Sequence, residues 1–228
     1  MLETAADALR AVAFDVNETL FPLEPLDERF AGAGLDPALR PLWFARTLRD
    51  GFALSAADDY RPFAEVAAAA LRSVGGADLD DAAVEQVLGG FAELDPHPDV
   101  EPALRRLKDA GVRVVTLTVG SSQVTDRQLR RCGLADLVDE TLDVSAVRRW
   151  KPAREPYLHA VERCGASTAT TALVAAHAWD VNGASRAGLR TGWVSRLETT
   201  YPPVFEAADV VGDDLDEVVE ALLTATEG

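Results

Sequence analysis

The chain has 228 residues, which is enough for one α/β domain with a sizeable insertion and a substantial hydrophobic core. Hydrophobic residues make up 48% of the chain and charged residues 26%, so a disordered or low-complexity protein is excluded. Acidic residues outnumber basic ones by 38 to 22, and the formal net charge is −16. Because nucleic acids and anionic membranes bind clustered Lys and Arg, neither is expected as a partner. A small anionic substrate stays compatible, since one local positive site can outweigh a distant negative field.

The cysteine content and the N-terminus indicate where the protein works. Cys132 and Cys164 match no metal-binding or disulfide spacing and are expected to be reduced thiols. The first ten residues carry acidic side chains and lack the basic start and apolar stretch of a signal peptide. No segment approaches the roughly 20 apolar residues that cross a bilayer. These features predict a soluble cytoplasmic protein.

The first predicted strand is 12–16, a short apolar run that contains Asp15 near its end. Strands buried on both faces of a parallel sheet have this pattern. From about Pro22 to Pro98 only helical patterns follow, at 36–50, 62–74 and 81–91. The first strand is therefore followed by a helical insertion and not by a single crossover helix.

After Pro98 the pattern changes to helices that alternate with short strands. The predicted helices are 100–110, 123–132, 155–164, 181–188 and 215–224. The predicted strands are 113–119, 141–144, 172–176, 192–194 and 209–211. Such alternation is typical of a parallel sheet with right-handed crossovers.

This order of elements predicts an α/β fold, a Rossmann-like doubly wound parallel sheet with an inserted helical cap. The predicted core is 1–20 plus 98–228, and the predicted cap is 21–97, with junctions near 21–25 and 96–98. We expect the cap and the core to pack as separate units. The site should then lie between them, where closure can exclude water.

Polar residues follow several of the predicted strands. The first strand ends at Asp15 with Asn17 behind it, the second ends at Thr118, Lys151 follows the third, and 177–180 follow the fourth. Each group alone has an ordinary structural explanation, as a turn, a solvated loop or a helix cap. In an open parallel sheet, however, ligands bind beyond the carboxyl ends of the strands. Four such groups at one edge indicate a functional site.

With these residues the sequence resembles the haloacid dehalogenase superfamily, and within it the type II L-2-haloacid dehalogenases. The resemblance rests on Thr118 and on three runs, 14–21, 150–152 with Tyr157, and 176–184, and it extends over essentially the whole chain. It implies hydrolytic removal of halide from a small 2-haloacid, without a cofactor.

The resemblance also implies roles for individual residues. Asp15 would be the nucleophile that forms a covalent ester, which water then hydrolyses. Lys151 would keep Asp15 ionised, while Asp180 would anchor Lys151 and help to position or activate the water. The Thr118 hydroxyl would help to receive the substrate's anionic group.

Further residues are expected to contact the substrate. The backbone N–H groups of Val16 and Val119 would bind the anionic group together with Thr118, because N–H donors at strand-to-helix turns suit an anion. The other expected contacts are Asn17, Trp43, Phe44, Tyr157 and Trp179. Aromatic residues at helical spacing are more often core residues, so a core role stays open for Trp43 and Phe44.

Asn17 separates the dehalogenases from the phosphatases of this superfamily. The phosphatases place there a second Asp, which protonates an alkoxide leaving group. An amide cannot deliver that proton, whereas a halide leaves without one, and loss of a general acid costs roughly 10²–10⁴ in rate. Lys151 would supply the positive charge, so no metal is expected. Only a phosphatase would use Asp15 and Asp180 to bind Mg²⁺.

Several positions depart from the dehalogenase pattern. Where the dehalogenases have an aromatic residue, this chain has Asn17. The Arg that follows the cap Trp is replaced by Phe44, and the Asn of the second motif is replaced by Val119. The fourth-motif Ser and Asn are Ala175 and His177. His177 is expected either to act on water or on the leaving group, ionising at about pH 6–7, or only to bond its neighbours.

Two alternatives therefore stay open, a magnesium-dependent phosphatase and a catalytically silent protein of the same fold. The resemblance also predicts a homodimer.

Overall fold

The computed structural model describes residues 8–76 and 79–225, and these form one six-stranded parallel sheet in the order β3-β2-β1-β4-β5-β6. The strands are β1 Ala11–Phe14, β2 Arg113–Thr118, β3 Glu140–Asp143, β4 Thr171–Ala175, β5 Arg190–Val194 and β6 Val210–Gly212. The prediction of a Rossmann-like doubly wound sheet is confirmed. Most of the N-terminal run used to exclude a signal peptide lies outside the described residues, and so do Ala77 and Asp78 in the predicted joint between cap helices.

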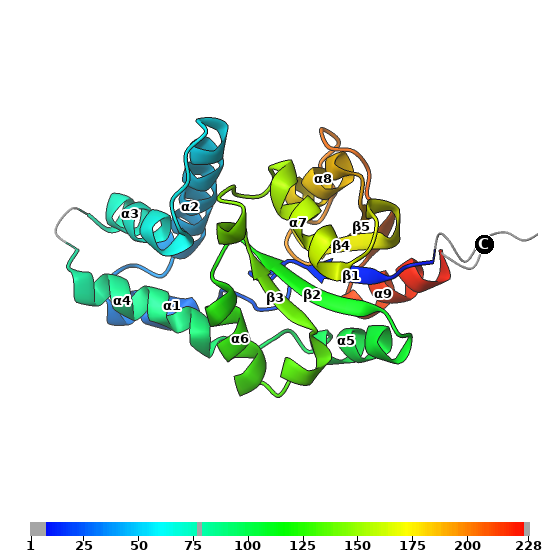
Figure 1. Cartoon of the computed structure of the whole chain (residues 1–228). Helices are drawn as coiled ribbons and strands as arrows, with labels where there is room; N and C mark the ends of the chain where they lie inside the picture. The colour runs from blue at the N-terminus through cyan, green and yellow to red at the C-terminus, as the bar shows by residue number, and fades with distance from the viewer. Residues whose placement is uncertain (1–7, 77–78, 226–228) are drawn as a thin grey trace, which may run out of the picture.

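Helices cover both faces of the sheet, as Figure 1 shows. They are α5 Val100–Asp109, α6 Ser122–Arg131, α7 Arg154–Cys164, α8 Ala178–Ala187 and α9 Leu215–Thr224. Successive strand residues point to opposite faces. Val12 and Phe14 of β1 therefore join the cluster that contains α5 and α9, whereas Ala13 joins the cluster of α7 and α8. Because both faces are covered, the strands consist largely of buried residues.

The segment between β1 and α5 contains helices and no further strand among its described residues. They are α1 Leu26–Gly32, α2 Leu39–Ala56, α3 Phe63–Gly75, α4 Asp81–Gly89 and the 3₁₀ turn Gly90–Glu93. The short α1 was not predicted, because Pro22 and Pro25 give its start the pattern of a loop. None of the helices formed by the described residues is long and apolar enough to cross a membrane.

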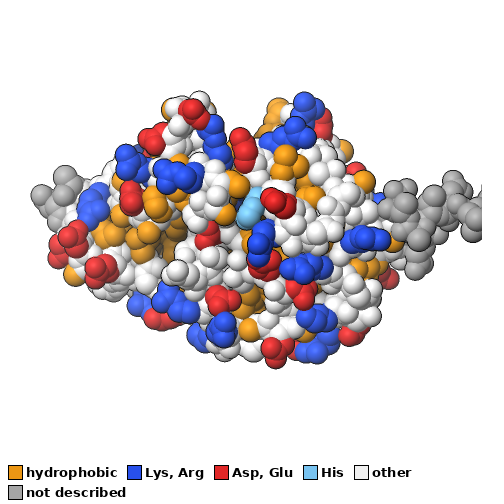
Figure 2. All heavy atoms as spheres, in the orientation of Figure 1, with side chains coloured by type: hydrophobic (Ala, Val, Ile, Leu, Met, Phe, Trp, Pro, Cys, Tyr) orange, Lys and Arg blue, Asp and Glu red, His pale blue; other side chains and the backbone are white. Residues whose placement is uncertain are grey.

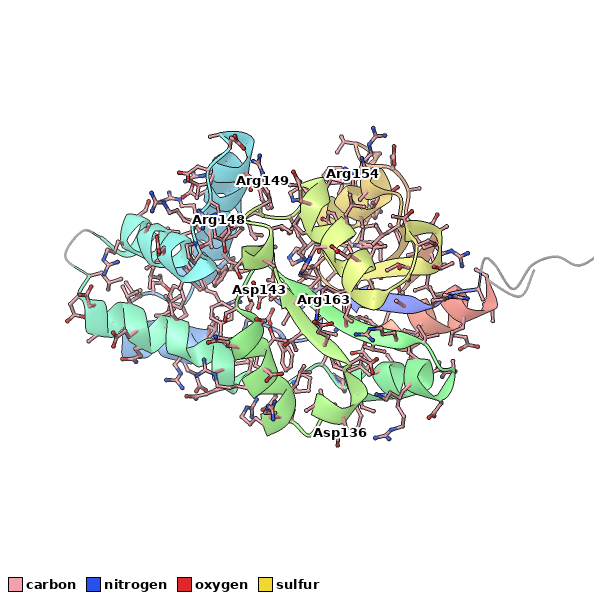
Figure 3. All side chains as sticks on the ribbon, viewed as in Figure 1. Asp136, Asp143, Arg148, Arg149, Arg154 and Arg163 are labelled. Carbon is pink, nitrogen blue, oxygen red and sulfur yellow. The ribbon has the colours of Figure 1, made fainter. Side chains whose placement is uncertain are left out.

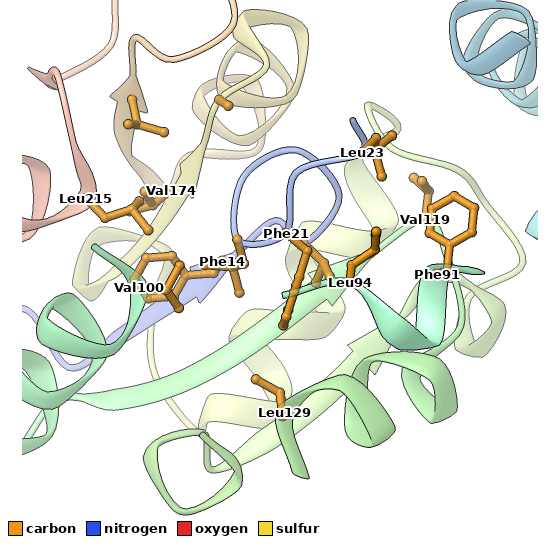
Figure 4. Packing of buried hydrophobic residues seen from close by; sticks show 14 of the residues in the cluster. Phe14, Phe21, Leu23, Phe91, Leu94, Val100, Val119, Leu129, Val174 and Leu215 are labelled. Atoms are coloured by element: carbon orange, nitrogen blue, oxygen red, sulfur yellow. The ribbon is translucent and has the colours of Figure 1, made fainter. Parts of the chain in front are cut away.

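Hydrophobic packing is continuous between the helical segment and the sheet. One buried cluster contains Trp43 and Leu71 of the segment together with Phe14 and Val174 of the sheet. Figure 4 shows the region where they meet, with Phe91 and other residues of the segment close to the strands. The helical segment and the sheet thus share one hydrophobic cluster where they meet, and the division into a core and a cap over 21–97 stays a prediction.

Acidic and basic side chains are interspersed over the face shown in Figure 2. Many of them form surface ion pairs, such as Arg106 with Asp216 and Arg186 with Glu206. Exposed pairs of this kind contribute roughly 0–1 kcal/mol each. The charges that carry the chemistry lie elsewhere, inside the protein.

Candidate active site

Asp15 lies directly after β1, at the centre of the sheet. Its backbone N–H donates to the Val174 carbonyl oxygen of β4 at 3.0 Å, and its side chain is buried at the carboxyl edge of the strands. The Thr19 hydroxyl donates to Asp15 Oδ2 at 2.7 Å and accepts from the Ala176 N–H at 3.0 Å. The carboxylate is thus held in one orientation by residues on both neighbouring loops.

Lys151 is completely buried beside Asp15. Its Nζ donates to Asp15 Oδ1 at 2.8 Å, to Asp180 Oδ2 at 2.6 Å and to the Leu117 carbonyl oxygen at 2.8 Å. An ammonium group has three N–H donors, so all of them are used. Lys151 therefore has no N–H left for a ligand in this arrangement.

The electrostatics keep this pair charged. Burial alone would raise the pKa of Asp15, but the positive charge of Lys151 and a hydrogen bond from His177 outweigh it and hold that pKa well below its usual range. Burial opposes the charge on Lys151 as well, yet Asp15 and Asp180 raise its pKa above the ordinary value. Asp15 is therefore an ionised carboxylate at neutral pH, as a nucleophile must be.

Asp180 lies behind Lys151, in the first turn of α8. The helix begins at Ala178, three residues before its predicted start at Val181, and this places Asp180 at the strand edge. Asp180 Oδ1 accepts from the Tyr157 hydroxyl at 2.6 Å. Burial raises the pKa of Asp180 even though Lys151 and Tyr157 oppose the shift. Tyr157 thus bonds Asp180, a contact that differs from its predicted contact with substrate.

Close packing fixes the position of Tyr157. A Cβ atom at Gly183 of α8 would lie 2.5 Å from the Tyr157 hydroxyl oxygen and 2.7 Å from Pro152 Cβ. Only glycine allows α8 to approach α7 so closely without displacing the tyrosine. The bond between Tyr157 and Asp180 therefore depends on a residue that has no side chain.

Comparisons with known proteins agree with this geometry. A sequence model of the haloacid dehalogenase-like hydrolases matches residues 9–188. The chain is 30% identical to an (S)-2-haloacid dehalogenase of Pseudomonas sp. strain YL, over 96% of this chain and 97% of that one. The chain belongs to the haloacid dehalogenase-like hydrolases.

Solved structures of the family agree with this assignment. An L-2-haloacid dehalogenase has a TM-score of 0.87 and 28% identity, over 94% of this chain and 99% of that one. A dehalogenase solved with an intermediate complex has a TM-score of 0.84 and 26% identity, over 95% of this chain and 98% of that one. The resemblance inferred from the sequence is confirmed.

On the other side of Asp15, this haloacid dehalogenase-like hydrolase has a second cation. His177 Nδ1 lies 3.4 Å from Asp15 Oδ2, and His177 Nε2 lies 2.9 Å from Glu18 Oε2. Burial opposes the charged imidazole, but the hydrogen bonds and charges of Asp15 and Glu18 prevail and raise the pKa of His177 to about 10. The two carboxylates therefore favour an imidazolium at neutral pH, whereas the titration near pH 6–7 was expected from an unperturbed imidazole.

Glu18 was not recognised as a site residue from the sequence. Its backbone has φ of 64°, in the left-handed region that favours glycine, at a cost of the order of 1 kcal/mol for a residue with a side chain. This conformation directs the carboxylate to His177. No local pattern announces a positive φ at a glutamate, so only the three-dimensional structure identifies this contact.

The aromatic residues expected at the site lie in different environments. Phe44 of α2 and Trp179 of α8 approach the His177 ring, with centroid distances of 6.4 and 5.3 Å. Trp43 is fully buried inside the helical segment, where its indole N–H donates to the Ala67 carbonyl oxygen at 2.8 Å. Of the two neighbouring aromatics on α2, the structure thus places Phe44 at the site and Trp43 in the interior.

A cavity of about 460 Å³ lies between the helical segment and the strand edge. Asn17 and Thr118 line this cavity. Asn17 lies two residues after Asp15, and Thr118 follows Leu117, whose carbonyl oxygen accepts a hydrogen bond from Lys151. Most of the apolar part of the wall consists of side chains from the helical segment, namely Tyr60, Pro62, Phe63, Ala64, Leu88 and Phe91, and α6 adds Val124. The polar part includes hydroxyl groups of the α6 N-terminus and Asp143, whose pKa is lowered because hydrogen bonds from Ser122 and Ser145 outweigh burial.

The loop that carries Lys151 is fixed by the helical segment. The Trp150 backbone N–H donates to Ser55 Oγ at 2.8 Å, and its indole N–H donates to the Arg61 carbonyl oxygen at 2.9 Å. Arg149 pairs with Asp58, and Figure 3 shows Arg148 and Arg149 next to α2. Residues of the segment therefore hold the loop in which Lys151 directly follows Trp150.

The described residues contain no group of three or more His, Cys, Asp or Glu side chains that could hold a metal ion. Asp15 and Asp180 are the carboxylates that the phosphatase alternative would use for Mg²⁺. The Lys151 ammonium lies between them and contacts both. Positive charge at the nucleophile thus comes from the chain itself.

Proposed function

We propose that this hydrolase removes halide from a small 2-haloacid through a covalent ester on Asp15. A carboxylate oxygen of Asp15 attacks C2, the carbon–halogen bond breaks, and the halide leaves with the electron pair. Water then attacks Asp15 Cγ, the C2–O bond stays intact, and the 2-hydroxy acid, a regenerated carboxylate and one proton are released. The observation that carries the proposal is a buried, ionised Asp15 with the amide of Asn17, and no second acid, two residues away.

The substrate carboxylate has a receptor at the same edge. Among the described residues, no acceptor is found for the backbone N–H groups of Val16 and Val119. The Thr118 hydroxyl oxygen accepts from the Gly120 N–H at 2.9 Å, so its own proton is free to be donated. Three donors at a strand-to-helix turn suit a carboxylate.

For the hydrolytic step we assign Asp180 first to holding Lys151. Both oxygens of its carboxylate already accept a hydrogen bond, one from Lys151 and one from Tyr157. Each carboxylate oxygen keeps a second lone pair, so Asp180 can also accept a hydrogen bond from the attacking water once Asp15 has been esterified and no longer pairs with Lys151. The ester of Asp15 carries no charge, so Lys151 is no longer held between two carboxylates and can shift.

The substrate's configuration and size follow from the relatives and from the cavity. Because the relative from Pseudomonas is an (S)-2-haloacid dehalogenase, we propose the (S)-haloacid as substrate and, after one inversion at C2, the (R)-hydroxy acid as product. The cavity of about 460 Å³ adjoins the strand edge at Asn17 and Thr118, and Asp15 itself does not line it; its apolar side would accommodate a short alkyl chain on C2.

The test is a panel of (S)- and (R)-2-haloacids and of phosphate esters, each assayed with and without EDTA. We expect halide release from (S)-substrates that EDTA does not change. Phosphate release that depends on Mg²⁺ would support the phosphatase alternative, and no release from either set would support the silent protein. A single turnover in H₂¹⁸O should place the label in the Asp15 carboxylate and leave the product hydroxyl unlabelled.

The remaining assignments are also proposals. We propose that residues 21–97 act as a cap over the site, that the protein works in the cytoplasm, and that it forms a homodimer. Both cysteines are free thiols, which agrees with a reducing compartment. Leu42 on α2 is 45% exposed and offers one apolar contact for a second subunit. Light scattering measures the oligomeric state.

A further inference from the structure

Glu18 combines backbone strain with burial in a way that the other left-handed residues do not. Among the described residues other than glycine, Glu18, Asp58 and Arg148 have positive φ. The Asp58 side chain is 84% exposed, whereas that of Glu18 is 15% exposed and contacts His177. Strained conformations persist where the surrounding structure holds them, and they concentrate at functional sites.

His177 is surrounded by two carboxylates and two aromatic rings. From the end of β1 it faces Asp15, from the following turn Glu18, from α2 the ring of Phe44, and from its own helix α8 the ring of Trp179. Lys151 lies on the opposite side of Asp15. The charged groups found against His177 in the described part of the chain are thus both carboxylates, and the two rings are uncharged.

The two cations beside Asp15 differ in what they can still bind. All three Lys151 N–H groups have acceptors at 2.8 Å or less. The Nδ1 of His177 is 3.4 Å from Asp15, a long and weak hydrogen bond, whereas its Nε2 is held by Glu18 at 2.9 Å. Nδ1 is therefore the available donor on a cation next to the nucleophile.

We propose that Glu18 is a positioning residue that holds His177 as a fixed cation, so that His177 Nδ1 can bind the anion that leaves when Asp15 is alkylated. The inference rests on the proposed function. As the ester forms, the negative charge moves from Asp15 to the departing halide, and the carbon–halogen electron pair goes with it. The imidazolium that faced the carboxylate then faces the halide, and no proton is transferred.

Other residues near this point do not supply such a charge. The helical segment presents the uncharged ring of Phe44 to His177. Arg46, two residues further along α2, is bound to the Ser73 carbonyl oxygen at 3.2 Å and to its hydroxyl at 2.9 Å. The cation for the leaving group is therefore supplied by the core, and Glu18 is the residue that fixes it.

The test uses Glu18→Gly and Glu18→Gln in the full chain. Glycine removes the carboxylate and also the strain, two changes with opposite effects on the melting temperature, while kcat/KM for (S)-2-chloropropanoate should fall. We expect a loss of roughly tenfold, smaller than the roughly 10²–10³ that follows removal of an electrostatic donor itself. Glutamine keeps the side-chain shape and should also lose activity.

Glu101→Gln is the control for Glu18→Gln, because it also removes a paired carboxylate, here from an exposed ion pair with Arg105 within α5. It should leave kcat/KM at the wild-type value. In a His177→Asn background, Glu18→Gly should have no further effect, since the residue through which it acts is gone.

An NMR titration of the imidazole rings gives a readout independent of turnover. The chain has 3 histidines, so the His177 signals can be assigned from single variants. In Glu18→Gly, the pKa of His177 should fall by at least about one pH unit. An unchanged His177 titration together with unchanged kcat/KM would overturn the proposal. An active-site titration that shifts as expected in a protein inactive on all haloacids would instead refute the proposed function.

Discussion

Asp15 has Lys151 on one side and His177 on the other, and the two cations differ in how firmly their hydrogen bonds hold them. Lys151 is fully buried, all its donors are used, and it is tied through Asp180 and Tyr157 to two helices. His177 is partly exposed, has one long hydrogen bond, and depends on a strained neighbour. The comparison indicates that the Lys151 side keeps the nucleophile ionised throughout, whereas the His177 side remains open to a ligand.

The largest expected effect is on the nucleophile that both sides share. Asp15→Asn should abolish halide release, because an amide cannot form the ester. The measurement is halide release together with mass spectrometry of the intact protein, which detects alkylated Asp15 and any deamidation. Asp136→Asn is the control: Asp136 is exposed and lies at the other end of the sheet from Asp143 in Figure 3. Turnover above a few per cent in undeamidated Asp15→Asn would remove Asp15 from its assigned role.

The second-largest effect is expected when Lys151 is replaced, and it distinguishes this buried cation from an exposed ion pair. Lys151→Met removes the cation that Asp15 and Asp180 share and leaves buried Asp180 without one, so the free energy of unfolding should fall by about 3–5 kcal/mol and halide release should nearly cease. The chain offers a matched control in its other lysine, Lys108, which is half-exposed and pairs with Asp139 at 3.3 Å. Lys108→Met should cost about 0–1 kcal/mol. Equal losses of stability in the two variants, measured by urea denaturation, would contradict a special role for the buried cation.

The sequence predicted the Lys151 side far better than the His177 side. Asp15 follows β1, Thr118 ends β2, and Asp180 lies in the first turn of the helix after β4, so the parallel sheet itself brings them to one edge. The bond between Tyr157 and Asp180 could not be predicted, because it depends on how closely α7 approaches α8. Glu18 was missed because its role follows from a positive φ, which a sequence pattern does not reveal.

The helical segment shows the same limit of prediction from sequence. Its helical character was readable from the pattern, but α2 ends at Ala56 and not at Asp50, because Gly51 lies against Trp150 and does not terminate the helix. Trp43 and Phe44 are adjacent on α2, about 100° apart around the helix, and the sequence could not tell which faces the site. Only packing against the sheet decides between them.

Gly51 provides a smaller test of how the Lys151 side is held. A Cβ atom at Gly51 would overlap the Trp150 ring, which is rigid and held by the indole hydrogen bond to Arg61, while the Trp150 backbone is held by Ser55. Gly51→Ala should therefore destabilise the protein by about 1–3 kcal/mol and reduce turnover by displacing the Lys151 loop. Gly89→Ala, in α4, is the control, because nothing lies within 4 Å of its added Cβ, and it should be neutral or stabilising by up to about 1 kcal/mol. A stable and fully active Gly51→Ala would show that the loop does not need this contact.

The smallest expected effect concerns His177: the rate of halide release should not change between pH 6 and pH 8. An ordinary imidazole titrates there, but the pKa of His177 is raised to about 10, so halide release should be flat across this range.

The same pKa shift also determines how the stability of the fold depends on pH. Because the folded-state pKa lies above the 6.5 of an unperturbed imidazole, charged His177 stabilises the fold fully below about pH 6.5, and this contribution is lost as the pH rises toward 10. The melting-temperature advantage of wild type over His177→Asn should therefore shrink between these limits. His159→Asn serves as the control for activity, because His159 lies on α7 and is not one of the residues assigned to the site. An inflection in halide release near pH 6.5 that disappears in His177→Asn would show that Glu18 and Asp15 do not hold the imidazole in its charged form.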